Sequence, residues 1–317
     1  MSNTNTFLGT SGNTAIYLGD TPIVSAYCGT NLIFPTVERD NYYEAVLSAD
    51  TQEINIITKP QSVRYYDTLE DGAWIRHTIP SGSTGPISYT FPTTGLQTVR
   101  YYIKKTKLSL LFAGDRYNMG IKVLSVTVNS DFINGDDFYE NRWLTAVTLN
   151  NTTSIYDYAF YENRVLKSIN LDGVQFIGAY AFNHAGLVGT FRIPDSVCYI
   201  DTAAFSNNDI YELYVGNGVT ELPKAFLWSS SLQYLSLGKN ITKLYCPTSS
   251  ADSFGISGSY MFNTIHLASS VWPTINDYTF KNIASSGTIV VPENITGTSW
   301  LEYEPFKSNN WYIDNPH

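Results

Sequence analysis

Residues 166–186 read LKSINLDGVQFIGAYAFNHAG, and residues 188–209 read VGTFRIPDSVCYIDTAAFSNND, a second version of the same unit. Five such units follow one another between residues 121 and 245, with three apolar columns repeating about every 22 residues. The columns are Val128, Leu149, Leu171, Ile193, Val215 and Leu237; Ile133, Ile155, Ile177, Ile200, Leu222 and Leu244; and Phe138, Phe160, Phe182, Phe205 and Phe226. A fixed period of this length indicates a solenoid, in which each unit buries its apolar face against its neighbours.

One unit shows how a coil is built. Residues 167–171 alternate between polar and apolar side chains, which predicts a short strand with Ile169 and Leu171 facing the core. Asp172-Gly173 then predicts a tight turn. A second turn places Phe182 in the core before the next strand begins. Each coil is therefore expected to contain one strand, one tight turn and one turn anchored by an aromatic residue.

The unit resembles the BspA-like family of leucine-rich repeats, whose pattern is I-x-x-x-A-F followed by L-x-x-I-x-L. The match is close at residues 155–171 (IYDYAFYENRVLKSINL) and 193–205 (IPDSVCYIDTAAF), and it covers roughly residues 108–306. The resemblance implies a mainly β protein with a leucine-rich-repeat solenoid of about 22-residue coils. In the C-terminal part, Phe254, Phe280 and Phe306 are expected to continue the aromatic column, and residues 247–260 are expected to form an insertion in one coil.

Three segments are expected along the chain. Residues 1–35 form a short β-arm, residues 36–105 a β-sandwich of short alternating strands, and residues 106–317 the solenoid with its caps. The run YTFPTTGLQTVRYYIK at 89–104 resembles the last two strands of immunoglobulin-like modules that precede BspA-like repeats. A half-repeat at 106–114 is expected to cap the solenoid at its start. Trp300, Trp311 and Tyr312 are expected to cap its end.

The N-terminal arm contains a smaller repeat. Phe7-Leu8-Gly9-Thr10, Tyr17-Leu18-Gly19-Asp20 and Tyr27-Cys28-Gly29-Thr30 recur at a step of ten residues. The structural interpretation of this repeat is a β-hairpin arm packed on the next domain. The amino-acid sequence of this arm also resembles N-terminal modules of virion structural proteins from Bacteroides-type phages and prophages. That resemblance implies that residues 1–35 dock the chain onto other virion proteins.

Composition excludes several functions. The chain has 317 residues and a net charge of −9 with no Lys/Arg run, which argues against nucleic acid as a partner. No apolar stretch approaches the roughly 18 residues that would favour membrane insertion. The first 15 residues lack the basic and apolar segments of a signal peptide. The odd number of cysteines, three, favours free thiols over a disulfide framework.

Catalytic chemistry is not indicated. The four histidines form no metal-ligating motif, and no nucleophile elbow, Walker loop or dinucleotide fingerprint is present, so we expect neither an enzyme nor a cofactor. Asp136, Asp137 and Glu140 could hold a calcium ion through oxygen ligands. A solvated acidic turn explains the same three residues and is preferred.

A binding surface is the better candidate. Alternation predicts that the strands of successive coils turn two polar columns outward, and Tyr and Arg are frequent anchors of binding sites. The residues predicted to bind are Asn170, Arg192, Glu212, Tyr214, Tyr234 and His266. A sheet face that is merely solvated accounts for the pattern equally well.

The first functional hypothesis is a bacteriophage virion protein, a tail-fibre-type or decoration subunit that displays the solenoid for host-surface binding. Its expected partners are other virion proteins through residues 1–35, a host-surface glycan or protein through the solenoid, and further copies of the chain in a homo-oligomer. The alternative is a bacterial cell-surface or extracellular adhesin of the BspA-like class, which binds host matrix proteins or other cells. The missing signal peptide favours the virion, because an adhesin must be secreted.

Overall fold

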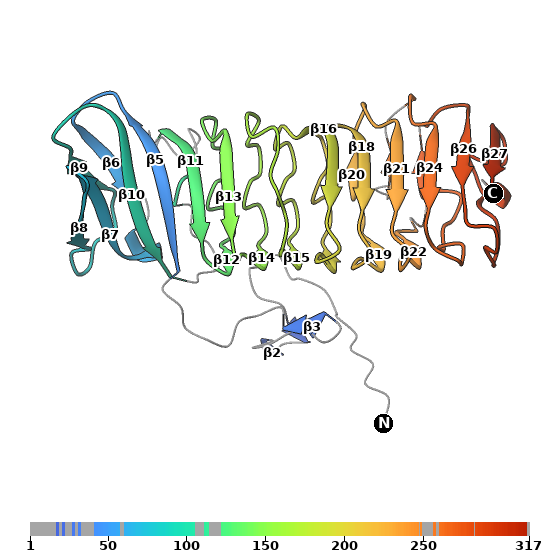
Figure 1. The fold of residues 1–317 in the computed structure, drawn as a ribbon, viewed down its shortest axis with the longest axis horizontal. Coiled ribbons are helices and arrows are strands. Elements are labelled where there is room, and N and C mark those ends of the chain that lie inside the picture. Colours follow the sequence, from blue (N-terminus) through green and yellow to red (C-terminus); the bar gives the residue numbers. More distant parts are fainter. Residues whose placement is uncertain are drawn as a thin grey trace.

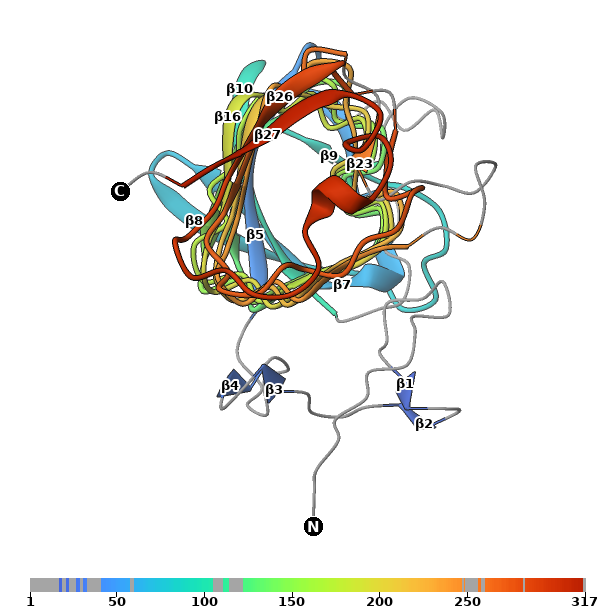
Figure 2. The ribbon, with the colours of Figure 1, turned by 90° about the vertical axis from the view of Figure 1, so that its right-hand side faces the viewer.

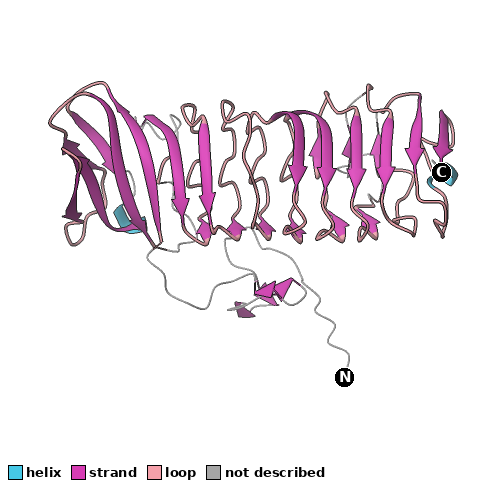
Figure 3. Cartoon of the chain, viewed as in Figure 1, coloured by secondary structure: helices cyan, strands magenta, loops and turns pink. Residues whose placement is uncertain are grey.

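In the computed structural model, the repeats stack in a row with an antiparallel β-domain at one end (Figure 1). The structure describes residues 41–57, 60–104, 111–113, 122–246, 248, 260–281 and 283–315, and the backbone of short strands at 17–18, 21–22, 27–28, 31–32 and 256–257. Strands and loops make up nearly all of these residues (Figure 3). In this part of the chain no helix is long and apolar enough to cross a membrane.

The β-domain is built from six strands and a short 3-10 helix. They are β5 (Tyr42–Ala49), β6 (Glu53–Ile57), η1 (Pro60–Ser62), β7 (Val63–Glu70), β8 (Ala73–Thr78), β9 (Ile87–Thr90) and β10 (Gly95–Ile103). β5, β10, β7 and β8 pair antiparallel in that order, and β6 pairs with β9. The β-domain therefore contains two antiparallel sheets, and the β-sandwich expected over residues 36–105 stays a prediction. The immunoglobulin-like character of this part stays a prediction.

The β-domain and the solenoid share one sheet. Strand β11 (Lys122–Asn129) pairs antiparallel with β5 on one side and parallel with β13 (Ala146–Asn150) on the other. The sheet order is therefore β13-β11-β5-β10-β7-β8. The expected boundary near residue 105 thus separates two parts whose backbones are hydrogen-bonded to each other through β5 and β11.

Aromatic side chains pack across the junction between the β-domain and the first coil of the solenoid. The Tyr43 ring lies 5.8 Å from Phe138, and its hydroxyl donates a 2.7 Å hydrogen bond to Oδ2 of Asp137. Phe112 stacks on Phe138 at 5.3 Å and meets Tyr101 edge-on at 4.9 Å. The half-repeat expected at 106–114 is described only at residues 111–113, all of which are buried. Its aromatic residue covers the first coil, as a cap should.

Long and short strands form separate sheets of the solenoid. We call the long strands of the coils, together with the β-domain strands that share their sheet, the front wall. It begins with the sheet that ends at β13 and continues with six parallel strands: β16 (Val188–Ile193), β18 (Asp209–Val215), β21 (Tyr234–Leu237), β24 (Thr264–Leu267), β26 (Ser286–Val290) and β27 (Asn310–Asp314). Short parallel strands elsewhere on the coils form three separate sheets: β12 (Phe132–Ile133), β14 (Ser154–Ile155), β15 (Phe176–Ile177) and β17 (Tyr199–Ile200); β19 (Glu221–Leu222) and β22 (Lys243–Leu244); and β20 (Leu227–Trp228), β23 (Ile256–Ser257) and β25 (Phe280–Lys281), the last of which is called the back wall. Seen along the row, β10, β16, β26 and β27 lie in one wall (Figure 2).

The aromatic column forms the predicted ladder. Phe138, Phe160, Phe182 and Phe205 are fully buried and stack nearly parallel at centroid distances of 5.0, 5.2 and 5.4 Å. Phe226 is also buried but meets Phe205 edge-on at 5.9 Å. Beyond it, Phe280 and Phe306 are buried as expected, whereas Phe254 lies outside the described residues. The period read from the sequence is therefore the stacking period of the coils.

One predicted strand is absent. Residues 167–171 form no ladder with either neighbour, so the solenoid strands fall into two sheets, one ending at β13 and one beginning at β16. Lys167 adopts a left-handed backbone (φ 62°), and the Ser168 amide donates to the Leu166 carbonyl at 2.7 Å. This local turn takes up an amide that a ladder would need. The predicted inward positions hold nevertheless, because Ile169 and Leu171 are buried.

Aromatic residues close the C-terminal end. The 3-10 helix η3 (Trp300–Glu302) brings Trp300 against Phe280 at 5.4 Å and Phe306 at 6.0 Å. Trp311 packs edge-on against Phe306 at 5.0 Å. Trp300 and Trp311 are buried and act as the predicted cap, whereas Tyr312 is 59% exposed and does not cover the core.

Two further expectations concern the arm and the cysteines. The backbone pairs β1 (Tyr17–Leu18) with β2 (Thr21–Pro22), and β3 (Tyr27–Cys28) with β4 (Asn31–Leu32), as antiparallel ladders. The rest of the 1–35 arm lies outside the described residues. Cys246 is a half-buried free thiol, as expected. The expectation is wrong for Cys198, which is disulfide-bonded; cysteine spacing along a sequence does not reveal which thiols the fold brings together.

Candidate binding surface on the front wall

The strand register of the front wall brings most of the predicted residues together. Arg192, Tyr214, Ser236 and His266 are directly opposite one another on β16, β18, β21 and β24. Thr190, Glu212, Tyr234 and Thr264 form the neighbouring row. These rows are the two predicted outward columns, since the intervening residues Phe191, Leu213 and Leu235 are buried.

Three of these side chains pack against one another and are here called the tyrosine cluster: Arg192, Tyr214 and Tyr234. The Arg192 guanidinium carbon lies 3.9 Å from the centroid of the Tyr214 ring, within cation–π range. The Tyr214 and Tyr234 rings are 5.3 Å apart and tilted by 40°. Arg192 is exposed and both tyrosines are half-buried, so part of each side chain reaches solvent. Partial burial, and next the neighbouring Tyr214, raise the pKa of Tyr234, which keeps its hydroxyl neutral.

Polar side chains border the tyrosine cluster. Thr190 donates a 2.9 Å hydrogen bond to Oε2 of Glu212, which sets a carboxylate beside the rings. Ser236 Oγ and His266 Nδ1 are 3.5 Å apart, at the limit of a hydrogen bond. A guanidinium, a carboxylate and two phenol groups within two rows can donate and accept hydrogen bonds while offering ring faces for stacking.

Asn170 does not join this group. Its side chain donates to Asp172 and accepts from the Asp172 amide, both at 3.0 Å, and it lies in the coil that lacks a strand. Asn170 therefore stabilises its own turn, and its predicted contribution to the same site is not supported by geometry.

Tyr211 was not predicted from the alternation of β18. The register between β16 and β18 shifts between Gly189 and Thr190, which turns Tyr211 outward as well as Glu212, and Tyr211 is 47% exposed. Its hydroxyl lies over Gly189, where an added Cβ would sit 3.7 Å away. Strict alternation predicts an inward Tyr211, so only the glycine on the preceding strand signals a bulge.

The acidic turn is structural. Asp137 is fully buried and accepts the Tyr43 hydrogen bond, so its carboxylate faces the core. Burial raises the pKa of Asp136 to about 6. Within the described residues no three His, Cys, Asp or Glu side chains are grouped to hold a metal ion.

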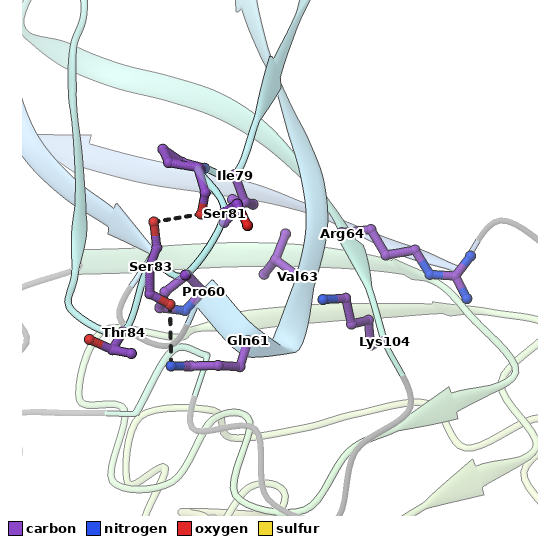
Figure 4. Close-up of a pocket in the computed structure, with 11 residues that line it drawn as sticks. Pro60, Gln61, Val63, Arg64, Ile79, Ser81, Ser83, Thr84 and Lys104 are labelled. Carbon is purple, nitrogen blue, oxygen red and sulfur yellow. Dashed lines mark hydrogen bonds between the residues drawn. The ribbon is translucent and has the colours of Figure 1, made fainter.

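A cavity of about 390 Å³ lies on the β-domain, between η1, the 79–84 loop and the end of β10. Gln61 donates to the Ser83 carbonyl at 3.4 Å and the Ser83 hydroxyl to the Pro80 carbonyl at 2.8 Å. The ammonium group of Lys104 lies beside Val63, whereas the Arg64 guanidinium points away (Figure 4). Few polar groups converge on this cavity, so the front wall is the stronger candidate.

Stacked coils with a parallel front wall define a leucine-rich-repeat solenoid. Residues 131–251 match, in six copies, the family described as BspA type leucine rich repeat region. This part of the chain is therefore a BspA-type repeat region, as the sequence motif implied. A search among curated proteins finds no match.

Two solved structures resemble part of this chain. A leucine rich cell surface protein from Faecalibacterium prausnitzii shares 18% identity over 60% of this chain, with a TM-score of 0.32, and the chain spans 59% of that protein. A leucine-rich repeat protein from Bacteroides ovatus shares 14% identity over 80% of this chain and 87% of its own, also with a TM-score of 0.32. Neither is similar enough to transfer a function.

Proposed function

We propose that this chain is a bacterial cell-surface recognition protein of the adhesin type, which binds an extracellular ligand at the tyrosine cluster. The BspA-type repeat region supports the adhesin alternative over the virion protein. The virion hypothesis rests on residues 1–35, whose side chains lie outside the described residues, and it gains no support from the family match. No catalytic role is part of this proposal.

One observation carries the proposal. The Arg192 guanidinium lies over the Tyr214 ring, and the Tyr214 ring packs at a tilt against Tyr234, on the outward side of strands whose inward residues already fill the core. The fold does not need aromatic rings at these positions, because a polar residue such as Ser236 occupies the equivalent position on the next strand. Exposed Tyr and Arg side chains grouped in this way are the usual anchors of a recognition surface.

The test is a double substitution, Tyr214→Ala with Tyr234→Ala. Binding of the purified protein to host epithelial cells and immobilised matrix proteins should fall at least about tenfold, since paired hot-spot side chains contribute roughly 1–2 kcal/mol or more each. The melting temperature should stay nearly unchanged because neither ring is in the core. Trp228→Ala is the matched control, since Trp228 is 57% exposed on the back wall. Normal binding by the double variant would remove this site.

Location separates the two hypotheses. Antibodies raised against the purified chain should label the surface of intact producing bacteria by flow cytometry. Labelling confined to purified phage particles would instead support the virion hypothesis.

A further inference from the structure

A second aromatic group lies on the β-domain side of the front wall. Its members, here called the platform, are Tyr42, Tyr65, Trp74, Arg76, Arg100 and Tyr102. The Arg76 guanidinium lies 4.1 Å from the Tyr65 ring, and the Arg100 guanidinium 3.7 Å from the Trp74 ring. The rings of Tyr65 and Tyr102 are 4.3 Å apart.

The core does not need these rings. The inward positions on the same strands are held by Tyr43, Tyr66 and Tyr101, which are buried in the core cluster that also contains the solenoid residues. The platform residues alternate with them and are half-buried or exposed. The platform therefore faces the same side of the front wall as the tyrosine cluster, since both lie opposite one continuous core.

Charge pairing indicates the kind of ligand. Arg76 binds Asp67 through two hydrogen bonds of 2.9 and 3.2 Å, and Arg100 binds Glu44 at 2.8 Å. Each platform arginine thus has its own carboxylate. In the tyrosine cluster, one arginine (Arg192) likewise has one carboxylate nearby, that of Glu212 in the neighbouring row, which accepts a hydrogen bond from Thr190. Balanced charges favour an uncharged ligand, because a charged one would be attracted by one partner and repelled by the other.

A polar lane connects the two groups. It consists of Thr127, Asn129, Thr148, Asn150 and Ser168, on β11, β13 and the coil that follows. Thr127 lies opposite Glu44 of the β-domain and Thr148 of the next coil, so the lane is in register with the platform. From β10 to β16 there are five strand or coil steps, about 24 Å at the usual strand spacing of roughly 4.8 Å.

We propose that the platform is a second subsite for the ligand of the tyrosine cluster, and that this ligand is an extended, uncharged glycan lying across the strands of the front wall. This inference rests on the proposed function. Aromatic rings at both ends pack on the apolar faces of sugar rings, and the hydroxyl and amide groups between them bind sugar hydroxyls. A protein partner would need an apolar centre, and the lane has none.

The experiment is affinity gel electrophoresis of the full chain in gels containing laminarin, xylan, galactomannan or glycogen, with heparin and polygalacturonate as charged comparisons. At least one neutral polysaccharide should retard the protein. Three variants should each raise the dissociation constant obtained from this retardation about tenfold or more. They are Tyr65→Ala with Trp74→Ala in the platform, Tyr214→Ala with Tyr234→Ala in the cluster, and Thr148→Arg in the lane.

Matched controls distinguish the outcomes. Trp228→Ala and Thr220→Arg change exposed residues away from these surfaces and should bind normally. Thr148→Arg should not change the binding of disaccharides from the same polysaccharide, because a disaccharide is too short to span the lane. Should the platform pair fail to fold, Trp74→Ala alone, on edge strand β8, makes the same test.

Three results would overturn the inference. Normal binding by the platform and lane variants, with loss only in the cluster variant, would leave the proposed function intact and remove the spanning ligand. Retardation by charged polysaccharides alone would remove the uncharged glycan. If no polysaccharide retards the protein, but binding to cells still depends on the tyrosine cluster, the ligand is a protein. The proposed function would then stand and the glycan would be removed.

Discussion

At the residue scale, buried polar groups distinguish this solenoid from a simple stack of apolar coils. Asp157 is 5% exposed and accepts a 2.8 Å hydrogen bond from the Ala179 amide through Oδ1. Its Oδ2 is buried without a hydrogen-bond partner among the described residues. Burial, and beyond it the neighbouring Asp201 and Asp136, raise the pKa of Asp157 to about 6.

The raised pKa of Asp157 predicts a pH dependence of stability. A carboxyl with a higher pKa in the folded chain stabilises the fold below its unfolded pKa of about 4, and this stability is lost as the pH rises through about 6. Asp157→Asn should therefore raise the melting temperature at pH 7 and flatten its fall between pH 4.5 and 7, because an amide needs no ionisation.

Asp195 provides a control of opposite sign. The backbone amide of Asn217 and then its side chain lower the pKa of Asp195, so its ionised form stabilises the fold. Asp195→Asn should lower the melting temperature at pH 7. A melting curve of Asp157→Asn with the wild-type pH dependence would show that Asp157 is solvated.

At the element scale, each coil depends on contacts with its neighbours. The phenylalanine ladder is continuous from Phe138 to Phe205 and turns edge-on at Phe226. Stacked rings bury one another on both faces, so removal of one ring opens a cavity that its backbone cannot close.

Phe182→Ala should therefore reduce the free energy of unfolding by roughly 3–5 kcal/mol, as in other aromatic core positions. Phe182→Leu should cost less, because it keeps more of the buried volume. Urea denaturation followed by circular dichroism measures both. An unchanged midpoint for Phe182→Ala would contradict the ladder.

At the scale of the whole molecule, both ends of the row are closed by aromatic residues. The β-domain covers one end through β5 and the Tyr43–Phe138 contact, and Trp300, Phe306 and Trp311 cover the other. The parallel strands of a solenoid otherwise expose an open edge and an open core, both of which promote aggregation.

Deletion of residues 41–104 should thus make the solenoid aggregate, because it uncovers β11 together with Val126 and Phe138. Size-exclusion chromatography with light scattering would detect this. Deletion of residues 1–35, a segment for which the sequence predicts no core, should leave a monodisperse protein. A monodisperse solenoid without residues 41–104 would show that the two parts fold independently, as the predicted boundary at residue 105 implies.

The sequence by itself determined the repeat, its period, the three core columns and the outward rows that contain Arg192, Tyr214 and Tyr234. These features are local: alternation sets which side chains face outward, and stacking at a fixed period repeats that choice in every coil. The BspA-type region could be recognised for the same reason, because its motif lies within one coil.

Only the tertiary structure decided the features that depend on distant or irregular contacts. The platform forms because β10 pairs with both β5 and β7 across long sequence separations, and no short pattern encodes that order. The bulge that exposes Tyr211, and the turn at Lys167 that replaces a predicted strand, each depend on one backbone conformation. A single shifted residue reverses which face a side chain occupies, and alternation alone cannot detect it.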